Sequence, residues 1–235
     1  MNLFYQPDIA RQPYLTEEDS RHAIKTLRLS VGESISVTDG QGTRFDCVIT
    51  KADARQCAVR IVEFHSTPRR PFSIRLCLAP TKNIDRIEWL VEKAVEIGVE
   101  RFSFFFSQHS ERRVLKTDRL IKIAVAAMKQ SLQSYLPQID EAVSFSQLLA
   151  AIQEEHRFIA HLPELSAPEH LFNLTVPQTS SAILIGPEGD FSGEELKQAV
   201  EAGFRMVTLG KNRLRTETAA LTACQIINLA NISKH

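Results

Sequence analysis

The stretch SAILIGPEGDFS at residues 181–192 decides the fold class of this sequence. It begins with a short apolar run that predicts a buried strand, and a loop with two glycines and a proline follows this run directly. Ser192 and Glu195 have the spacing of a capping box, so a helix is expected to begin after the loop. A strand, a tight loop and a capped helix in this order are typical of α/β proteins, in which ligands bind beyond the carboxyl ends of the strands.

The same alternation of strand and helix patterns extends on both sides of this stretch. Asp85 is the predicted N-cap of one helix, and Gly98 is its predicted C′ residue. Alternating strands and helices predict an α/β fold with a mostly parallel sheet and helices on both of its faces. The strand candidates lie at 73–79, 99–106, 157–162, 181–185 and 204–209, and the helix candidates lie at 85–97, 117–133, 144–154, 192–202 and 216–232.

The chain before residue 70 has a different pattern. Its short segments alternate polar and apolar residues, which predicts a small antiparallel sheet or barrel with a hairpin around Asp39 and Gly40. The proline-containing stretch at 66–71 has the composition of a linker, so we expect one domain at 1–70 and a second at 71–235. The strand candidates of the first domain lie at 33–38, 44–49 and 57–62, and one helix candidate lies at 17–29.

Composition and charge narrow the function classes. The chain has 235 residues, 43% of them hydrophobic and 24% charged, which excludes disordered and fibrous classes and allows a full core. We expect a soluble cytoplasmic protein, because no apolar run approaches the roughly 18 residues that a membrane span needs and the first residues lack a signal-peptide layout. The four cysteines are scattered without a C-x-x-C pair, so we expect them to be packing residues and expect no metal site.

A second glycine-bearing loop follows about one strand-helix unit later, in the stretch VTLGKNRLRTETAAL at 207–221. Lys211, Arg213 and Arg215 precede the start of an apolar helix, so cationic side chains and free helix N–H groups share one place and predict an anionic partner. The chain has 28 basic and 28 acidic residues, yet seven basic and only two acidic residues lie at 101–130. This local excess of positive charge favours binding of nucleic acid, whose phosphates contribute much of the affinity.

Three stretches together resemble a known family: IGPEGDFS at 185–192, LGKNRLRTETA at 209–219 and IEWLVEKAVEIG at 87–98. In their order and spacing they are similar to the ribosomal RNA small-subunit methyltransferase E family of the SPOUT superfamily. His22, Arg28 and Gly32 resemble its amino-terminal domain, so the likeness extends over the whole chain. Asp190 departs from the pattern, because the family commonly has glycine there.

The resemblance implies S-adenosylmethionine-dependent methylation of N3 of a uridine in 16S ribosomal RNA of the small subunit. It also implies a PUA-like β-barrel domain followed by a parallel sheet with a carboxyl-terminal trefoil knot, and an obligate homodimer. Carried over to this sequence, the cofactor residues would be Leu162, Pro163, Ile185, Gly186, Pro187, Glu188, Gly189, Leu209, Gly210, Leu214, Arg215, Thr216 and Thr218. The RNA contacts are expected at His22, Lys25, Arg28, Arg112 and Arg113.

Catalysis at a weakly acidic imide nitrogen requires the loss of its proton. Arg215, with Arg213 second, is the candidate that stabilises the resulting anion, and Glu217 is the candidate proton acceptor. The target base must leave its pair, and Phe191 or Tyr135 is a candidate to stack on it. Two alternatives stay open: a ribose 2′-O RNA methyltransferase of the same superfamily, and a non-catalytic RNA-binding assembly factor.

Overall fold

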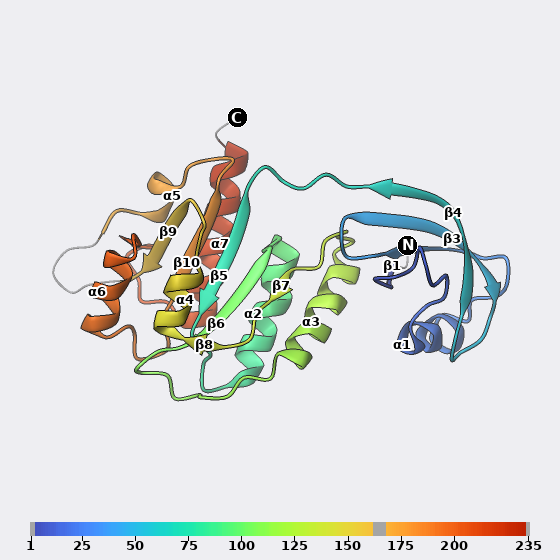
Figure 1. The fold of residues 1–235 in the computed structure, drawn as a ribbon, viewed down its shortest axis with the longest axis horizontal. Coiled ribbons are helices and arrows are strands. Elements are labelled where there is room, and N and C mark those ends of the chain that lie inside the picture. The colour runs from blue at the N-terminus through green and yellow to red at the C-terminus, as the bar shows by residue number, and fades with distance from the viewer. Residues whose placement is uncertain (1–2, 162–167, 234–235) are drawn as a thin grey trace. The chain divides into compact units, whose positions relative to one another are not determined.

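The computed structural model of the chain describes residues 3–161 and 168–233, which form two compact units (Figure 1). The first unit comprises Met1–Arg69 and Val125–Leu136, and the second comprises Arg70–Ala124 and Pro137–His235. The start of the second unit at Arg70 agrees with the place of the expected linker, but the segment 125–136 belongs with the first unit. The division into domains at residue 70 stays a prediction.

The first unit contains a four-stranded sheet in the order β1-β2-β3-β4. The hairpin between β2 and β3 is confirmed, and the Asp39 carboxylate stabilises it by accepting hydrogen bonds from the N–H groups of Gln41 at 2.7 Å and Thr43 at 3.0 Å. β1 pairs in parallel with β2, an arrangement that the alternating pattern did not indicate. The strands are β1 (Leu3–Tyr5), β2 (Ser34–Thr38), β3 (Thr43–Lys51) and β4 (Ala58–Ser66).

The helix expected at 17–29 is shorter in the structure. It consists of α1 (Glu17–Arg21), capped by the Thr16 hydroxyl, and one π-helical turn, η1 (His22–Thr26). Arg28 then has a φ of 59°, in the left-handed region, where no right-handed helix continues. Helical spacing of apolar residues therefore overestimated the length of this helix.

The second unit is built on a parallel sheet in the order β11-β9-β10-β5-β6-β7, with β8 also paired to β6. Every pairing in it is parallel, which confirms the fold class predicted from the alternation of strands and helices. Its strands are β5 (Ser73–Leu78), β6 (Arg101–Phe106), β7 (Gln138–Ile139), β8 (Val143–Ser144), β9 (His156–Ala160), β10 (Ser180–Ile185) and β11 (Arg205–Val207).

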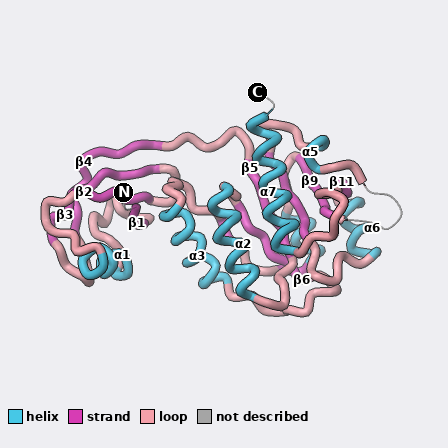
Figure 2. Tube along the Cα trace, turned by 180° about the vertical axis from the view of Figure 1, so that it is seen from behind, coloured by secondary structure: helices cyan, strands magenta, loops and turns pink. Residues whose placement is uncertain are grey.

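Helices cover both faces of this sheet. Figure 1 shows α4 and α6 in front of it, and Figure 2, from behind, shows α2 and α7 on the other face. The helix α2 ends at Gly98 as predicted, with φ 96°, but its N-cap is Asn83 rather than Asp85, because the Asn83 side chain accepts from the Asp85 N–H. The helices are α2 (Ile84–Ile97), α3 (Thr117–Gln130), α4 (Phe145–Ala151), α5 (Leu171–Leu174), α6 (Gly193–Glu201) and α7 (Thr216–Ser233).

The cores of the two units are apolar and contain the cysteines. All four cysteines are buried and free, which confirms the expectation that they are packing residues. Burial raises the pKa of the Cys77 thiol to about 12 and that of the Cys224 thiol to about 12, so neither is a thiolate near neutral pH. Within the described residues, no helix combines the length and apolar character that crossing a membrane requires.

Candidate active site

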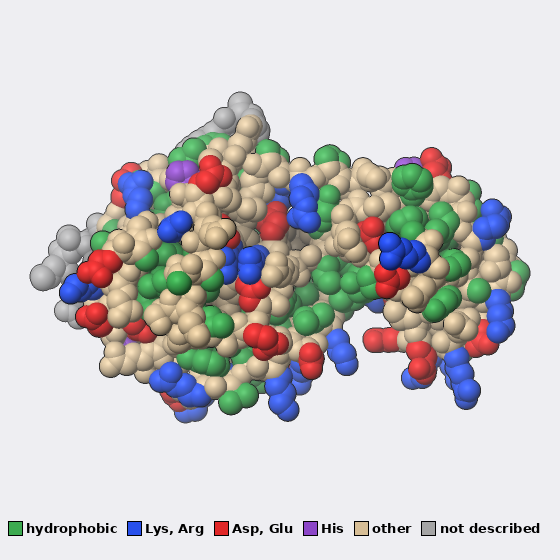
Figure 3. Space-filling view, in the orientation of Figure 1, with side chains coloured by type: hydrophobic (Ala, Val, Ile, Leu, Met, Phe, Trp, Pro, Cys, Tyr) green, Lys and Arg blue, Asp and Glu red, His purple; other side chains and the backbone are tan. Residues whose placement is uncertain are grey.

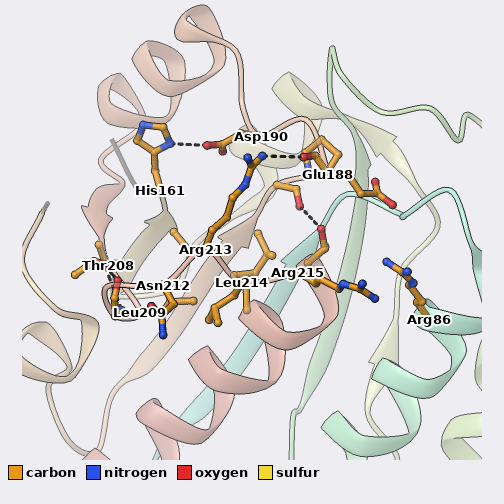
Figure 4. Close-up of a pocket in the computed structure, with 18 residues that line it drawn as sticks. Arg86, His161, Glu188, Asp190, Thr208, Leu209, Asn212, Arg213, Leu214 and Arg215 are labelled. Atoms are coloured by element: carbon orange, nitrogen blue, oxygen red, sulfur yellow. Dashed lines mark hydrogen bonds and ion pairs between the residues drawn. The ribbon is translucent and has the colours of Figure 1, made fainter. Parts of the chain in front are cut away.

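A cavity of about 400 Å³ lies at the carboxyl ends of β9, β10 and β11 (Figure 4). Both glycine-bearing loops contribute to it, together with the residues that follow β9 and one side chain of α2, Arg86. The edge of a parallel sheet outside its carboxyl ends is the usual place for a ligand in α/β proteins. The lining residues are Arg86, Ala160, His161, Ile185, Gly186, Pro187, Glu188, Asp190, Val207, Thr208, Leu209, Gly210, Asn212, Arg213, Leu214, Arg215, Thr216 and Ala219.

Asp190 holds the first loop in a left-handed turn. Its φ is 61°, a conformation in which glycine is favoured, and the residue therefore needs local support. Its carboxylate accepts the Phe191 N–H at 2.7 Å and lies 3.0 Å from Nδ1 of His161, at the end of β9. Asp190 thus compensates for the departure from glycine by joining the first loop to the end of β9 (Figure 4).

The first loop is also held from outside. His109 Nδ1 lies 3.1 Å from the carbonyl oxygens of both Gly189 and Asp190, and because carbonyls only accept, this nitrogen must carry the proton. Glu195, in the predicted capping box of α6, is buried and also accepts the Gln108 N–H at 2.9 Å. These bonds lock the loop to the segment after β6.

Phe191 packs into the core. Its ring is 6% exposed and stacks on that of Phe105, with the centroids 6.1 Å apart. The expectation that Phe191 stacks on a target base is therefore wrong, because its ring is covered by protein. The ring of Tyr135 lies under the guanidinium of Arg69, 4.5 Å from its centroid, and its hydroxyl donates to the Thr67 carbonyl.

The second loop, at 208–216, has fewer supports. The Thr208 side chain closes a turn with Gly210, and the Thr216 hydroxyl donates to the Gly186 carbonyl at 3.2 Å, which ties the two loops together. Gly210 has a φ of 138°, and nothing lies within 4 Å of the position that a Cβ atom would take. The basic side chains of this loop are exposed, and that of Arg213 reaches the Glu188 carbonyl only at 3.5 Å.

Most of the cofactor residues expected from the resemblance line the cavity. Gly189 and Thr218 do not, and Leu162 and Pro163 lie outside the described residues. Five further lining residues with polar or charged side chains were not among the expected site residues. His161 could have been found because it directly follows a predicted strand, and Asn212 because it lies between two basic residues of the second loop. No local signal marks Arg86, which lies inside a helix. The expected cofactor residues that line the cavity are Ile185, Gly186, Pro187, Glu188, Leu209, Gly210, Leu214, Arg215 and Thr216, and the polar or charged lining residues that were missed are Arg86, His161, Asp190, Thr208 and Asn212.

The three catalytic candidates have different environments. Arg213 and Arg215 line the cavity and are exposed. Glu217 is 8% exposed, does not line the cavity, and its Oε1 lies 3.7 Å from Nη1 of Arg86. Its Oε2 is buried without a hydrogen-bond partner in the part of the chain that the structure describes.

The RNA-contact candidates of the first unit are exposed, but acidic residues stand beside them. His22 and Lys25 lie in η1, directly after the acidic first turn of α1. Within that turn, the buried Asp19 accepts the Tyr5 N–H at 3.0 Å and pairs with Lys129 at 2.7 Å. Asp19 and Lys129 therefore have a structural role, and the exposed His22, Lys25 and Arg28 stay the candidates in this unit.

The candidates of the second unit are bonded to its backbone. Arg112 donates to the carbonyls of Thr81 at 3.1 Å and Lys82 at 2.7 Å, and Arg113 donates to that of Gln108 at 3.1 Å. Figure 3 shows Lys and Arg side chains at the lower edge of the second unit, to which the arrow of β5 points in Figure 1. Arg112 thus supports the loop before α2.

Comparison with known proteins identifies the family. A model described as an RNA methyltransferase domain matches residues 68–228, and one described as an RNA methyltransferase PUA domain matches residues 15–62. The ribosomal RNA small subunit methyltransferase E of Mesomycoplasma hyopneumoniae is 30% identical over 171 residues, which cover 69% of this chain and 73% of that protein. The chain belongs to the ribosomal RNA small-subunit methyltransferase E family.

Solved structures agree with this membership. A probable rRNA-methyltransferase from Porphyromonas gingivalis is 40% identical, with a TM-score of 0.92 and full coverage of both chains. The ribosomal RNA small subunit methyltransferase E of Neisseria gonorrhoeae, bound to S-adenosyl methionine, is 27% identical with a TM-score of 0.85, over 97% of each chain. The α/β fold and the PUA-like amino-terminal domain implied by the resemblance are confirmed, and the trefoil knot stays a prediction.

Proposed function

We propose that this member of the methyltransferase E family transfers the methyl group of S-adenosylmethionine to N3 of a uridine in 16S ribosomal RNA of the small subunit. The observation that carries the proposal is the meeting of both glycine-bearing loops in one cavity at the carboxyl edge of the sheet. The family relative from Neisseria gonorrhoeae binds S-adenosyl methionine, which supports the same cofactor here.

The residues of the cavity fit this cofactor. A volume of about 400 Å³ lies within the range of small-molecule sites. Ile185, Leu209 and Leu214 form an apolar part of the cavity wall. At Gly210, no atom lies within 4 Å of the position that a Cβ atom would take. Gly186 cannot be larger without displacing the Phe191 ring, which would lie 3.1 Å from an added Cβ. We propose that these residues hold the cofactor, which when bound supplies an electrophilic methyl group on a sulfonium sulfur.

Residues of the chain would stabilise the uracil ring of the substrate during the reaction. The N3 proton of the uridine must leave, which puts negative charge on the neighbouring carbonyl oxygens. Arg215 at the cavity, with Arg213 beside it, would stabilise this charge, while the apolar wall excludes water. Alignment of the two reactants supplies much of the remaining rate. The proposal needs no metal ion, because opposite charges neutralise one another as the new bond forms.

The wider partners follow from the same proposal. His22, Lys25, Arg28, Arg112 and Arg113 are proposed RNA contacts, and the target uridine is unpaired or flipped out when it reacts. We further propose a cytoplasmic homodimer. The proposal of a dimer is supported by exposed apolar side chains on α7, since Leu229 is 44% exposed and Ile232 is 70% exposed. Light scattering of the purified protein tests the dimer.

Methylation of purified small subunits in vitro tests the reaction. With labelled cofactor and mass spectrometry of the nucleosides, we expect N3-methyluridine in the 16S RNA. A 2′-O-methylated nucleoside would instead identify a ribose methyltransferase, and the absence of both label transfer and cofactor binding would identify a non-catalytic factor.

The role of Arg215 has its own test. We expect Arg215→Ala to reduce kcat about 100-fold, in the range seen when one transition-state donor is lost, with cofactor binding retained. Calorimetry measures that binding separately. Normal turnover by this variant would remove Arg215 from the chemistry.

A further inference from the structure

Arg86 reaches the cavity from outside both loops. It belongs to the first turn of α2, and 35% of its side chain is exposed. Figure 4 shows Arg86 and Arg215 pointing toward one another, one from α2 and the other from the segment before α7. Two guanidinium groups therefore meet at one side of the cavity.

The carboxylates near this side leave the two arginines available. Glu188 accepts the Lys82 N–H at 3.1 Å, and Asp190 pairs with His161. Among the carboxylates of the described residues, only that of Glu217 pairs with Arg86, at 3.7 Å, which is longer than a normal hydrogen bond. A guanidinium has five N–H donors, so Arg86 keeps donors for a ligand.

Glu217 is placed to act through Arg86. Its carboxylate is buried behind the cavity lining, and Oε2 has no hydrogen-bond partner in the chain as described. A buried carboxylate without full hydrogen bonding is costly and depends on a facing cation. Glu217 can hold the guanidinium of Arg86 in place from this position, whereas it does not itself border the space that a substrate would enter.

We propose that Arg86 is a catalytic residue that, with Arg215, binds the carbonyl oxygens of the N3-deprotonated uracil, and that Glu217 is its positioning residue rather than the proton acceptor. The inference rests on the proposed function. The N3–H bond breaks with its electron pair left on the ring, and the proton passes to solvent water. The charge spreads onto the two carbonyl oxygens, where guanidinium N–H donors meet it.

Kinetics of Arg86→Ala on purified small subunits test the first part. We expect kcat to fall about 100-fold, as for loss of one such donor, with KM for the subunits and the calorimetric affinity for S-adenosylmethionine within about twofold of wild type. The rate should also continue to rise to a higher pH, because the uracil loses a group that favours its anion. Arg86→Lys should restore part of kcat, since it keeps the charge.

A double-mutant cycle tests Glu217. We expect Glu217→Ala to lower kcat in the wild-type background and to have little further effect in the Arg86→Ala background. Glu217→Gln should keep the shape of the pH profile. A loss of the acid limb in Glu217→Gln, independent of Arg86, would make Glu217 the base and overturn its positioning role.

Control measurements distinguish a failure of the inference about Arg86 from a failure of the proposed function. Arg205→Gln, an exposed arginine at the start of β11, should behave as wild type, and thermal unfolding checks that each variant is folded. A raised KM with unchanged kcat would mean an RNA phosphate contact, and weaker cofactor binding would mean a cofactor contact; either overturns the inference. If wild type makes N3-methyluridine and Arg86→Ala matches it, the inference alone fails. If wild type makes none, the proposed function fails with it.

Discussion

Arginines at the two ends of the parallel sheet have opposite environments. At the amino end, the Arg75 side chain is 5% exposed and faces Asp140 at 3.6 Å and Glu154 at 3.3 Å. Arg101 stands opposite Arg75 on the next strand and pairs with Asp140 at 2.7 Å. Nε of Arg75 also donates a hydrogen bond to the Ser103 hydroxyl at 2.8 Å. Every guanidinium of this cluster thus has a carboxylate beside it.

At the carboxyl end, the same residue type is nearly unpaired. Arg86 has one long contact to Glu217, and Arg213 has one long contact to the Glu188 carbonyl. Among the described residues, the guanidinium of Arg215 has no partner. An arginine therefore contributes to stability where carboxylates surround it and remains available to a ligand where they do not.

The largest expected loss of stability is at the amino end of the sheet, where Arg75 is buried beside carboxylates. Replacing Arg75 by Met leaves the carboxylate of Glu154 without its cation, whereas Asp140 keeps Arg101, and we expect the free energy of unfolding to fall by about 3–5 kcal/mol. Urea unfolding measures this loss. Arg21→Met is the matched control, because its pair with Glu17 is exposed on both sides and contributes less than about 1 kcal/mol. Equal losses in the two variants would contradict the comparison.

The pH dependence of stability gives a second test of the arginine and carboxylate cluster at the amino end of the sheet. Burial by itself raises the pKa of Asp140, but hydrogen bonds from Arg101 and Ser103 outweigh burial and hold that pKa below its ordinary value. Asp140 therefore stabilises the fold above the unfolded pKa of about 4, and this contribution is lost as the pH falls through the folded pKa.

We expect Asp140→Asn to lower the free energy of unfolding by about 1–2 kcal/mol at pH 7 and to unfold with a weaker dependence on acid. Urea titrations at pH 7, 5 and 4 provide the measurement. An unchanged slope between pH 5 and 4 would show that other carboxylates dominate.

Substitutions of Asp190 test what stabilises the first loop at the carboxyl end of the sheet. We expect Asp190→Ala to lose about 1–2 kcal/mol, because alanine keeps the left-handed strain and loses the His161 contact. Asp190→Gly should stay within about 1 kcal/mol of wild type, since glycine removes the strain as well as the contact. Thermal unfolding compares the two, and a glycine variant as unstable as the alanine variant would show that the contact with His161 dominates.

The smallest expected change in stability is at Arg213 and Arg215. Replacing either by Gln should change the free energy of unfolding by less than about 0.5 kcal/mol, because neither guanidinium has a carboxylate partner in the described structure. Urea unfolding checks this against Arg75→Met. A loss of several kcal/mol would mean that these arginines belong to the scaffold.

Local patterns predicted much of the architecture. The stretch at 181–192 predicted β10, its loop and the capping box of Ser192 with Glu195, because each of these features depends on neighbours within a few residues. The helix at 17–29 was overestimated because apolar spacing does not reveal the left-handed φ of Arg28. The parallel pairing of β1 depends on a partner about 30 residues away, and no local signal indicates it.

Short-range propensity and residue type were enough to predict the class of fold, the two glycine-bearing loops and the positive charge beside the second loop. Three further facts appear only in the folded chain: Arg86 joins the cavity, Glu217 stands behind Arg86, and Phe191 belongs to the core. Those facts depend on which distant elements pack together, and packing is set by long-range burial rather than by local sequence.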